Sequence, residues 1–195
     1  MGLRRGPSGA PATVSIRPIA ASETYPLRHA VLWPSQPASY VQLPEDVEGQ
    51  HFGAFGDAAS RGGEDVGAPS TTAAAAAAAE PRDEEDEEDE ADVPQRLVSV
   101  ISLFVDAARR EARFRKFATA PAWQGRGVGS ALLAHALDAA ARAGAARISC
   151  DARLSALAFY RRFGLEAPAP AEDGLPAVFF KGDVPYVRLE KSLLP

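Results

Sequence analysis

A glycine-rich segment, QGRGVGS, is the part of the sequence best suited to hold an anion. Glycines let a ligand approach the main chain closely, and exposed N–H groups at the start of a helix favour negative charge. Arg126 adds a fixed positive charge. We therefore predict a site for phosphate or pyrophosphate; the alternative is a turn that only caps the helix. The residues concerned are Gln124, Gly125, Arg126, Gly127, Val128, Gly129 and Ser130.

Two common phosphate-binding motifs do not fit this segment. A nucleotide P-loop needs GxxxxGK[ST], and no lysine follows these glycines. A dinucleotide-binding fingerprint needs GxGxxG, whereas the spacing here is GxGxG.

The hydrophobic pattern predicts an α+β fold, a central mixed sheet flanked by helices, with the order β-α-β-β-β-α-β-α-β-β. The glycine segment then lies between the fourth strand and the second helix, whose apolar stripe runs from Val128 to Ala140 and whose cap is Gly144. Strands are expected over 14–19, 50–55, 96–105, 111–119, 145–150, 177–181 and 185–191, and helices over 22–33, from about 127, and over 155–163.

Three segments together resemble the GNAT superfamily of N-acetyltransferases. QGRGVG matches that family's Q/R-x-x-G-x-G/A signature, FRKFATAPAW resembles its central strand and the linker after it, and ALAFYRRFGLE resembles a later helix. The resemblance covers residues 12–57 and 94–195. Two positions depart from the family pattern: Asp151 stands where Asn is frequent and is less suited to an anionic cofactor, and Leu165 replaces an aromatic residue.

The resemblance implies acetyl-coenzyme A as cosubstrate, no metal, and direct attack of an amine on the thioester. It also implies that main-chain N–H groups near Phe117, Ala118 and Thr119 polarise the thioester carbonyl. Phe114 and Phe117 are three residues apart, so burial of both on one face of a strand requires a bulge. Helices on both faces of the sheet would make the bulge unnecessary.

Tyr160 is implied by the resemblance as the proton donor to the coenzyme thiolate; the alternative is an aromatic residue packed in the core. An alkyl amine with a pKa near 10.4 is almost fully protonated at pH 7, so a base or a water chain is also needed. The candidate bases are Glu111, His29 and His51.

Four further residues have less specific expectations. Tyr186 either lines the acceptor pocket or packs in the core, and Cys150 is expected to be a buried small residue rather than a nucleophile. Arg28 faces either an anionic acceptor or water, with water favoured, and His135 is expected to be a solvated surface residue.

An acidic segment interrupts the predicted domain. Residues 57–94 hold 13 of the 26 Asp and Glu residues but only two of the 21 Lys and Arg residues, so the rest of the chain is basic. Such a composition predicts a disordered insertion over about 58–93, within a single domain of residues 12–195 that follows a disordered 1–11. The insertion is a solubilising loop, a docking tail for a basic partner, or an intramolecular competitor of an anionic ligand.

Composition narrows the class of protein. A single cysteine excludes a disulfide framework, and we expect an intracellular, cytoplasmic protein, with a nuclear location open, that binds neither membrane nor nucleic acid. The predicted activity is acetyl transfer to a small amine, a peptide N-terminus or a lysine. Two alternatives are an inactive acyl-coenzyme A sensor and an interaction protein that acts through its acidic loop.

Overall fold

The computed structural model describes residues 12–57, 95–168 and 177–194. The predicted disordered segments, 1–11 and about 58–93, lie outside these residues. The strands are β1 (Val14–Ile19), β2 (Gln50–Asp57), β3 (Gln95–Asp106), β4 (Glu111–Thr119), β5 (Arg147–Arg153), β6 (Val178–Lys181) and β7 (Val184–Ser192). The α-helices are α1 (Ala21–Leu32), α2 (Val128–Arg142) and α3 (Leu157–Arg161), and the 3-10 helices are η1 (Ala38–Val41), η2 (Pro44–Val47), η3 (Pro121–Trp123) and η4 (Leu154–Ala156).

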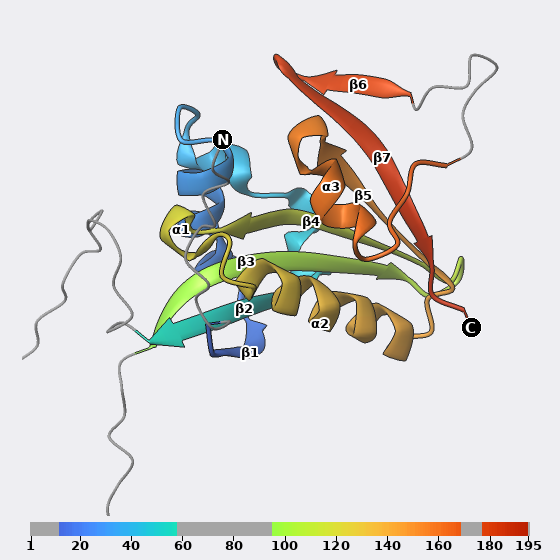
Figure 1. The fold of residues 1–195 in the computed structure, drawn as a ribbon, viewed down its shortest axis with the longest axis horizontal. Coiled ribbons are helices and arrows are strands. Elements are labelled where there is room, and N and C mark those ends of the chain that lie inside the picture. The colour runs from blue at the N-terminus through green and yellow to red at the C-terminus, as the bar shows by residue number, and fades with distance from the viewer. Residues whose placement is uncertain (1–11, 58–94, 169–176, 195) are drawn as a thin grey trace, which may run out of the picture.

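The strands form one seven-stranded sheet in the order β1-β2-β3-β4-β5-β7-β6. All neighbouring strands are antiparallel except β4 and β5, which are parallel. Helix α2 crosses one face of β2 and β3, as Figure 1 shows, whereas α1 packs against β3 and β4. The predicted mixed sheet and the predicted order of elements are therefore confirmed.

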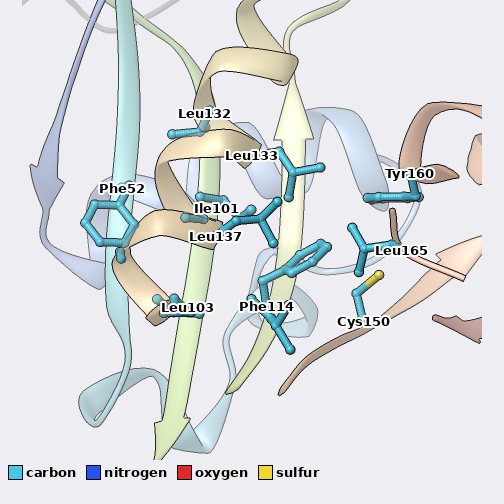
Figure 2. Close-up of a cluster of buried hydrophobic side chains, with 14 of the residues drawn as sticks. Phe52, Ile101, Leu103, Phe114, Leu132, Leu133, Leu137, Cys150, Tyr160 and Leu165 are labelled. Carbon is cyan, nitrogen blue, oxygen red and sulfur yellow. The ribbon is translucent and has the colours of Figure 1, made fainter. Parts of the chain in front are cut away.

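The main core lies between α2 and the sheet (Figure 2). Leu132, Leu133 and Leu137 of α2 are buried against strand residues that include Ile101 and Phe114. The predicted apolar stripe of α2 is thus confirmed, since a period near 3.6 residues places these side chains on one face.

His135 departs from its prediction as a solvated residue. Its ring packs edge-on against Phe52, with ring centroids 4.7 Å apart, and the side chain is half-buried. Burial lowers the pKa of His135, and the positive charge of Arg142 lowers it further. A residue beside the apolar stripe of a helix can still be covered by a large side chain from a strand, as Phe52 of β2 covers His135.

The expectation that Arg28 faces water is wrong. Its guanidinium is fully buried beneath α1 and donates to both carboxylate oxygens of Asp46, at 2.7 and 2.9 Å, and to the Ser102 hydroxyl. His51 is buried beside them, with hydrogen-bonding distances of 2.7 Å to Ser102 Oγ and 2.8 Å to the Asp46 carbonyl. The carboxylate of Asp46 comes from helix η2. The spacing of residues within α1 therefore could not reveal that Arg28 has a buried partner.

Strands β4 and β5 separate soon after they begin. Only Glu111–Arg113 pairs with Arg147–Ser149. Beyond that point β4 continues along β3 as far as Thr119, whereas β5 continues along β7 as far as Arg153. This separation opens the sheet and positions the candidate site.

Candidate active site

A cleft of about 1010 Å³ lies where β4 and β5 separate. Its walls come from the end of α1, the second half of β4, the start of α2, and the segment from β5 to α3, with residues of β6 and β7 closing one side. It brings together nine of the predicted site residues: Phe117, Ala118, Thr119, Gln124, Gly125, Gly127, Gly129, Ser130 and Tyr160.

Two predicted site residues do not line the cleft. Val128 is buried in the core beneath α2, and the Arg126 guanidinium lies 5.4 Å from the centre of the Trp123 ring. The positions of Val128 and Arg126 follow from the local backbone conformation, because the chain turns at Gly125 and again at Gly127. Gly125 and Gly127 have φ values of 74° and 84°, in the left-handed region that favours glycine.

The start of α2 is open toward the cleft. Gly127 is the N-cap residue, and because glycine has no side chain, no cap bond from this residue covers the first turn of the helix. A Cβ placed on Gly125 would have no atom within 4 Å, so there is free space over the loop. A Cβ on Gly129 would instead lie 3.2 Å from Thr119 Oγ1, so the helix packs closely on β4. Main-chain N–H groups and the positive end of the helix dipole therefore face an open space beside β4.

Strand β4 contains the predicted bulge. Ser102 of β3 pairs with Arg115 and Val100 pairs with Ala118, so Lys116 and Phe117 together face one residue of β3. Lys116 has a φ of 53°, which is rare for a residue with a side chain. The Phe114 and Phe117 rings consequently lie on the same face, with centroids 6.5 Å apart. The bulge is thus confirmed, and it interrupts the ladder at the cleft.

Tyr160 lies at the margin of the core cluster, near Leu165 and Cys150 (Figure 2). Its ring centroid is 5.9 Å from that of Phe114 and 5.1 Å from that of Phe159. Burial raises the pKa of the Tyr160 phenol above its usual value, with a smaller contribution from Cys150. The hydroxyl therefore stays protonated at physiological pH, in a form that can donate a proton and cannot accept one.

Cys150 is buried and its thiol is inert. Burial raises the pKa of Cys150 to about 12, with a smaller contribution from the charge of Asp151. The thiolate needed for nucleophilic attack is therefore scarce at neutral pH. The expectation of a buried small residue is confirmed.

None of the three candidate bases lines the cleft. Glu111 is at the opposite end of β4 and pairs with Arg147, and His51 belongs to the buried group around Arg28. His29 is hydrogen-bonded, at 2.6 Å, to the carbonyl of Gln36. Their types suited proton transfer, but their positions in the fold keep them away from the cleft.

Tyr186 does line the cleft, as one of its two predicted roles requires. Its hydroxyl accepts a hydrogen bond of 3.2 Å from Arg153 Nε, and its ring stacks on Phe179 at 6.0 Å. Sequence reasoning did not identify Arg153, Lys116 or the other cations that border the cleft. The alternation of Arg113 and Arg115 with apolar neighbours in β4 could have indicated these two arginines, but no local pattern pointed to Arg153 or Lys116.

Asp151, the departure from the family pattern, is surrounded by cations. It bonds to Arg113 at 2.5 Å, to Arg188 at 2.6 Å and to Lys181 at 2.8 Å. Burial raises its pKa, but the hydrogen bonds from Lys181 and Arg188 outweigh burial, so the pKa lies below its usual value. The carboxylate is therefore charged at neutral pH, and its charge is more than offset locally.

The described residues, 12–57, 95–168 and 177–194, contain no helix long and apolar enough to cross a membrane. These residues also contain no group of three or more His, Cys, Asp or Glu side chains placed to hold a metal ion.

Comparison with known proteins gives a family. The model of the acetyltransferase (GNAT) family matches residues 69–165. A search of curated protein sequences gave no significant match.

Solved structures share the fold at low sequence identity. The IAA acetyltransferase from Bacillus cereus is 19% identical, with a TM-score of 0.54, and the match covers 92% of this chain and 99% of that one. A Bacillus subtilis acetyltransferase in complex with CoA is 15% identical, with a TM-score of 0.53 and coverage of 93% and 100%. A GNAT family acetyltransferase from Elizabethkingia anophelis with acetyl-CoA bound is 13% identical, with a TM-score of 0.53 and coverage of 92% and 97%. With its family match, its mixed sheet and its cleft between β4 and β5, the chain belongs to the GNAT superfamily of acetyltransferases.

Proposed function

We propose that the protein is an N-acetyltransferase that moves the acetyl group of acetyl-CoA directly to an amine. One observation carries the proposal: the open N-terminus of α2 and the bulge of β4 border the same cleft. The first suits a pyrophosphate, and the second suits the carbonyl of an acyl group. Structural relatives with bound CoA and acetyl-CoA support this choice of cosubstrate.

The cleft has room and chemistry for this cosubstrate. The space over Gly125 and the uncapped amides that follow Gly127 would hold the pyrophosphate, with the helix dipole adding to the attraction. Residues Phe117–Thr119 would border the acyl end, because the bulge places them in the cleft wall. Acetyl-CoA supplies an activated acyl thioester.

Tyr160 is the proposed proton donor. The amine nitrogen forms the new bond to the acyl carbon, the bond from that carbon to sulfur breaks, and sulfur leaves with the electron pair. The proton that the nitrogen loses on becoming an amide passes to solvent water, and solvent returns a proton to Tyr160 after each turnover. The Tyr160 hydroxyl lines the cleft and stays protonated, so it can give its proton to the departing sulfur. Neither Cys150 nor an acyl-enzyme takes part.

An acyl-CoA sensor without turnover is the second candidate. The observation that favours it is the absence of Glu111, His29 and His51 from the cleft, since an amine must lose a proton before it attacks. A sensor would bind acetyl-CoA and release no thiol with any amine. The acidic segment is not required for chemistry under either proposal, so deletion of residues 58–93 should leave coenzyme binding intact.

The deciding experiment combines calorimetry with CoA and acetyl-CoA and a thiol-release assay over small amines, peptides and lysine derivatives. The test variant is Gly127→Asp and the matched control is Gly144→Asp, because the two glycines have φ values of 84° and 83°. Both substitutions add the same strain and charge, but only Gly127 borders the cleft. We expect coenzyme binding to weaken at least tenfold in the first variant and to persist in the second. Absence of binding to the unmodified protein would refute the proposed function.

A further inference from the structure

The second wall of the cleft lies on the sheet face opposite α2. In β4, Arg113 and Arg115 alternate with Ala112 and Phe114, which are buried beneath α2, so the two arginines point to the other face. In β5, Asp151 alternates with core residues in the same way. This wall is made by Arg113, Arg115, Lys116, Asp151, Arg153 and Lys181, and Arg188 lies behind it, bound to Asp151. The whole group of seven residues is called the basic wall.

A single carboxylate at the centre of the basic wall is shared by three cations. Asp151, whose side chain is only 7% exposed, bonds to Arg113, Lys181 and Arg188. These groups come from β4, β5, β6 and β7. One negative charge cannot neutralise three positive charges, so the group keeps two.

Two further cations have neutral partners. Arg153 donates to the Tyr186 hydroxyl and, at 2.9 Å, to the Leu32 carbonyl, whereas Lys116 Nζ lies 5.7 Å from the centre of the Tyr40 ring. Within the described residues no carboxylate forms a salt bridge with either. The remaining cation, Arg115, is paired with Glu45.

Counted over the described residues, the basic wall therefore has four more positive charges than the carboxylates bound to it. Their fields overlap, because Arg115 and Lys181 both contribute to lowering the pKa of Lys116, after the larger effects of burial and Arg28. Such a wall repels a plain alkylammonium ion and attracts an anion. It also favours the neutral form of a nearby amine, which offsets part of the cost of deprotonation in a cleft without the expected bases.

We propose that the basic wall is an acceptor subsite that selects amines carrying an anionic group, such as a carboxylate. This inference rests on the proposed function and names its substrate class. The anionic group would bind between Arg153 and Lys181, and the amine would lie toward Tyr160, which borders the same cleft. Trp33, Tyr40 and Tyr186 add aromatic surface around it. The glycine loop that suits the coenzyme phosphates lies at the start of α2, on the other face of the sheet.

The test measures binding of two amines with the same aromatic framework to the full-length chain saturated with CoA, by ligand-observed NMR at low salt. The probes are 4-(aminomethyl)benzoate and 4-methylbenzylamine, which differ by a carboxylate in place of a methyl group. We expect the carboxylate probe to bind at least fivefold more tightly, and 0.5 M salt to remove most of that preference. A second arm compares a short peptide amide beginning with Asp with one beginning with Asn, and tests whether a peptide amine shows the same preference for a carboxylate.

Variants locate the effect. Arg153→Gln and Lys181→Gln should each reduce the preference for the carboxylate probe to less than twofold, without changing CoA binding. Arg109→Gln removes an exposed cation from the distant turn before β4 and should leave the preference unchanged. Equal binding of the two probes, tighter binding of the methyl probe, or no detectable binding of either overturns the proposal. Loss of CoA binding would instead count against the proposed function, because the probe preference can be measured without CoA.

Discussion

Replacement of Tyr160 by Phe tests the proposed proton donor most directly. A phenol has a pKa of about 10 and a thiol about 8.5, so donation to a thiolate is uphill by about 2 kcal/mol in water. Burial raises the pKa of Tyr160, which makes donation still less favourable. The donor therefore assists the departure of sulfur without being indispensable.

We expect Tyr160→Phe to lower kcat by about 10- to 100-fold, at the low end of what general acid catalysis contributes. KM for acetyl-CoA should change less than about twofold, because the ring keeps its contacts with Phe114 and Phe159. Stability should also be retained, since no hydrogen bond to the Tyr160 hydroxyl is found among the described residues.

The assay is thiol release at saturating acetyl-CoA with an acceptor from the amine panel, together with thermal unfolding of each variant. Tyr25→Phe is the matched control, because it removes the same hydroxyl from a tyrosine of α1 that does not line the cleft. An unchanged kcat in Tyr160→Phe would remove Tyr160 from the mechanism. An equal loss in Tyr25→Phe would attribute the effect to structure rather than to proton donation.

Two further predictions concern stability. Arg28→Met should lower the free energy of unfolding by about 3–5 kcal/mol in denaturant titrations, because it leaves the buried Asp46 carboxylate without its ion-pair partner. Arg28→Met combined with Asp46→Leu should recover much of that loss, and no recovery would contradict this account. Burial lowers the pKa of Lys116 to about 8, whereas in the unfolded chain this pKa is near 10.5. Between these two pH values the unfolded state therefore binds more protons than the folded state, so the free energy of unfolding should rise with pH across that window. The rise should be absent in Lys116→Met, and parallel curves for the two proteins would show that Lys116 does not cause it.

The elements were predictable because their signals are local. The bounds of β1 and β4 agree with the sequence, since alternation marks both strands and Pro121 follows β4, without reference to distant residues. The bulge in β4 was predictable too, from the odd spacing of Phe114 and Phe117, although a sheet without it remained an alternative. The third helix was longer in prediction than α3, whose first turn is the separate 3-10 helix η4.

Residues whose role depends on a distant partner were predicted poorly. Arg28 was expected to face water because its position in α1 reveals neither Asp46 nor Ser102. The candidate bases had suitable chemistry, but chemistry alone does not place a side chain in a cleft.

By itself the sequence determined the family resemblance, the order of the elements and the glycine loop at the start of a helix. The elements and the loop depend on spacing within one segment, which backbone geometry converts directly into structure, and three such segments together carry the resemblance. Only the tertiary structure decided that Asp151 meets cations from three other strands and that positive charge gathers on one wall of the cleft. Those encounters depend on which strands become neighbours and which faces they share, and no local period encodes that.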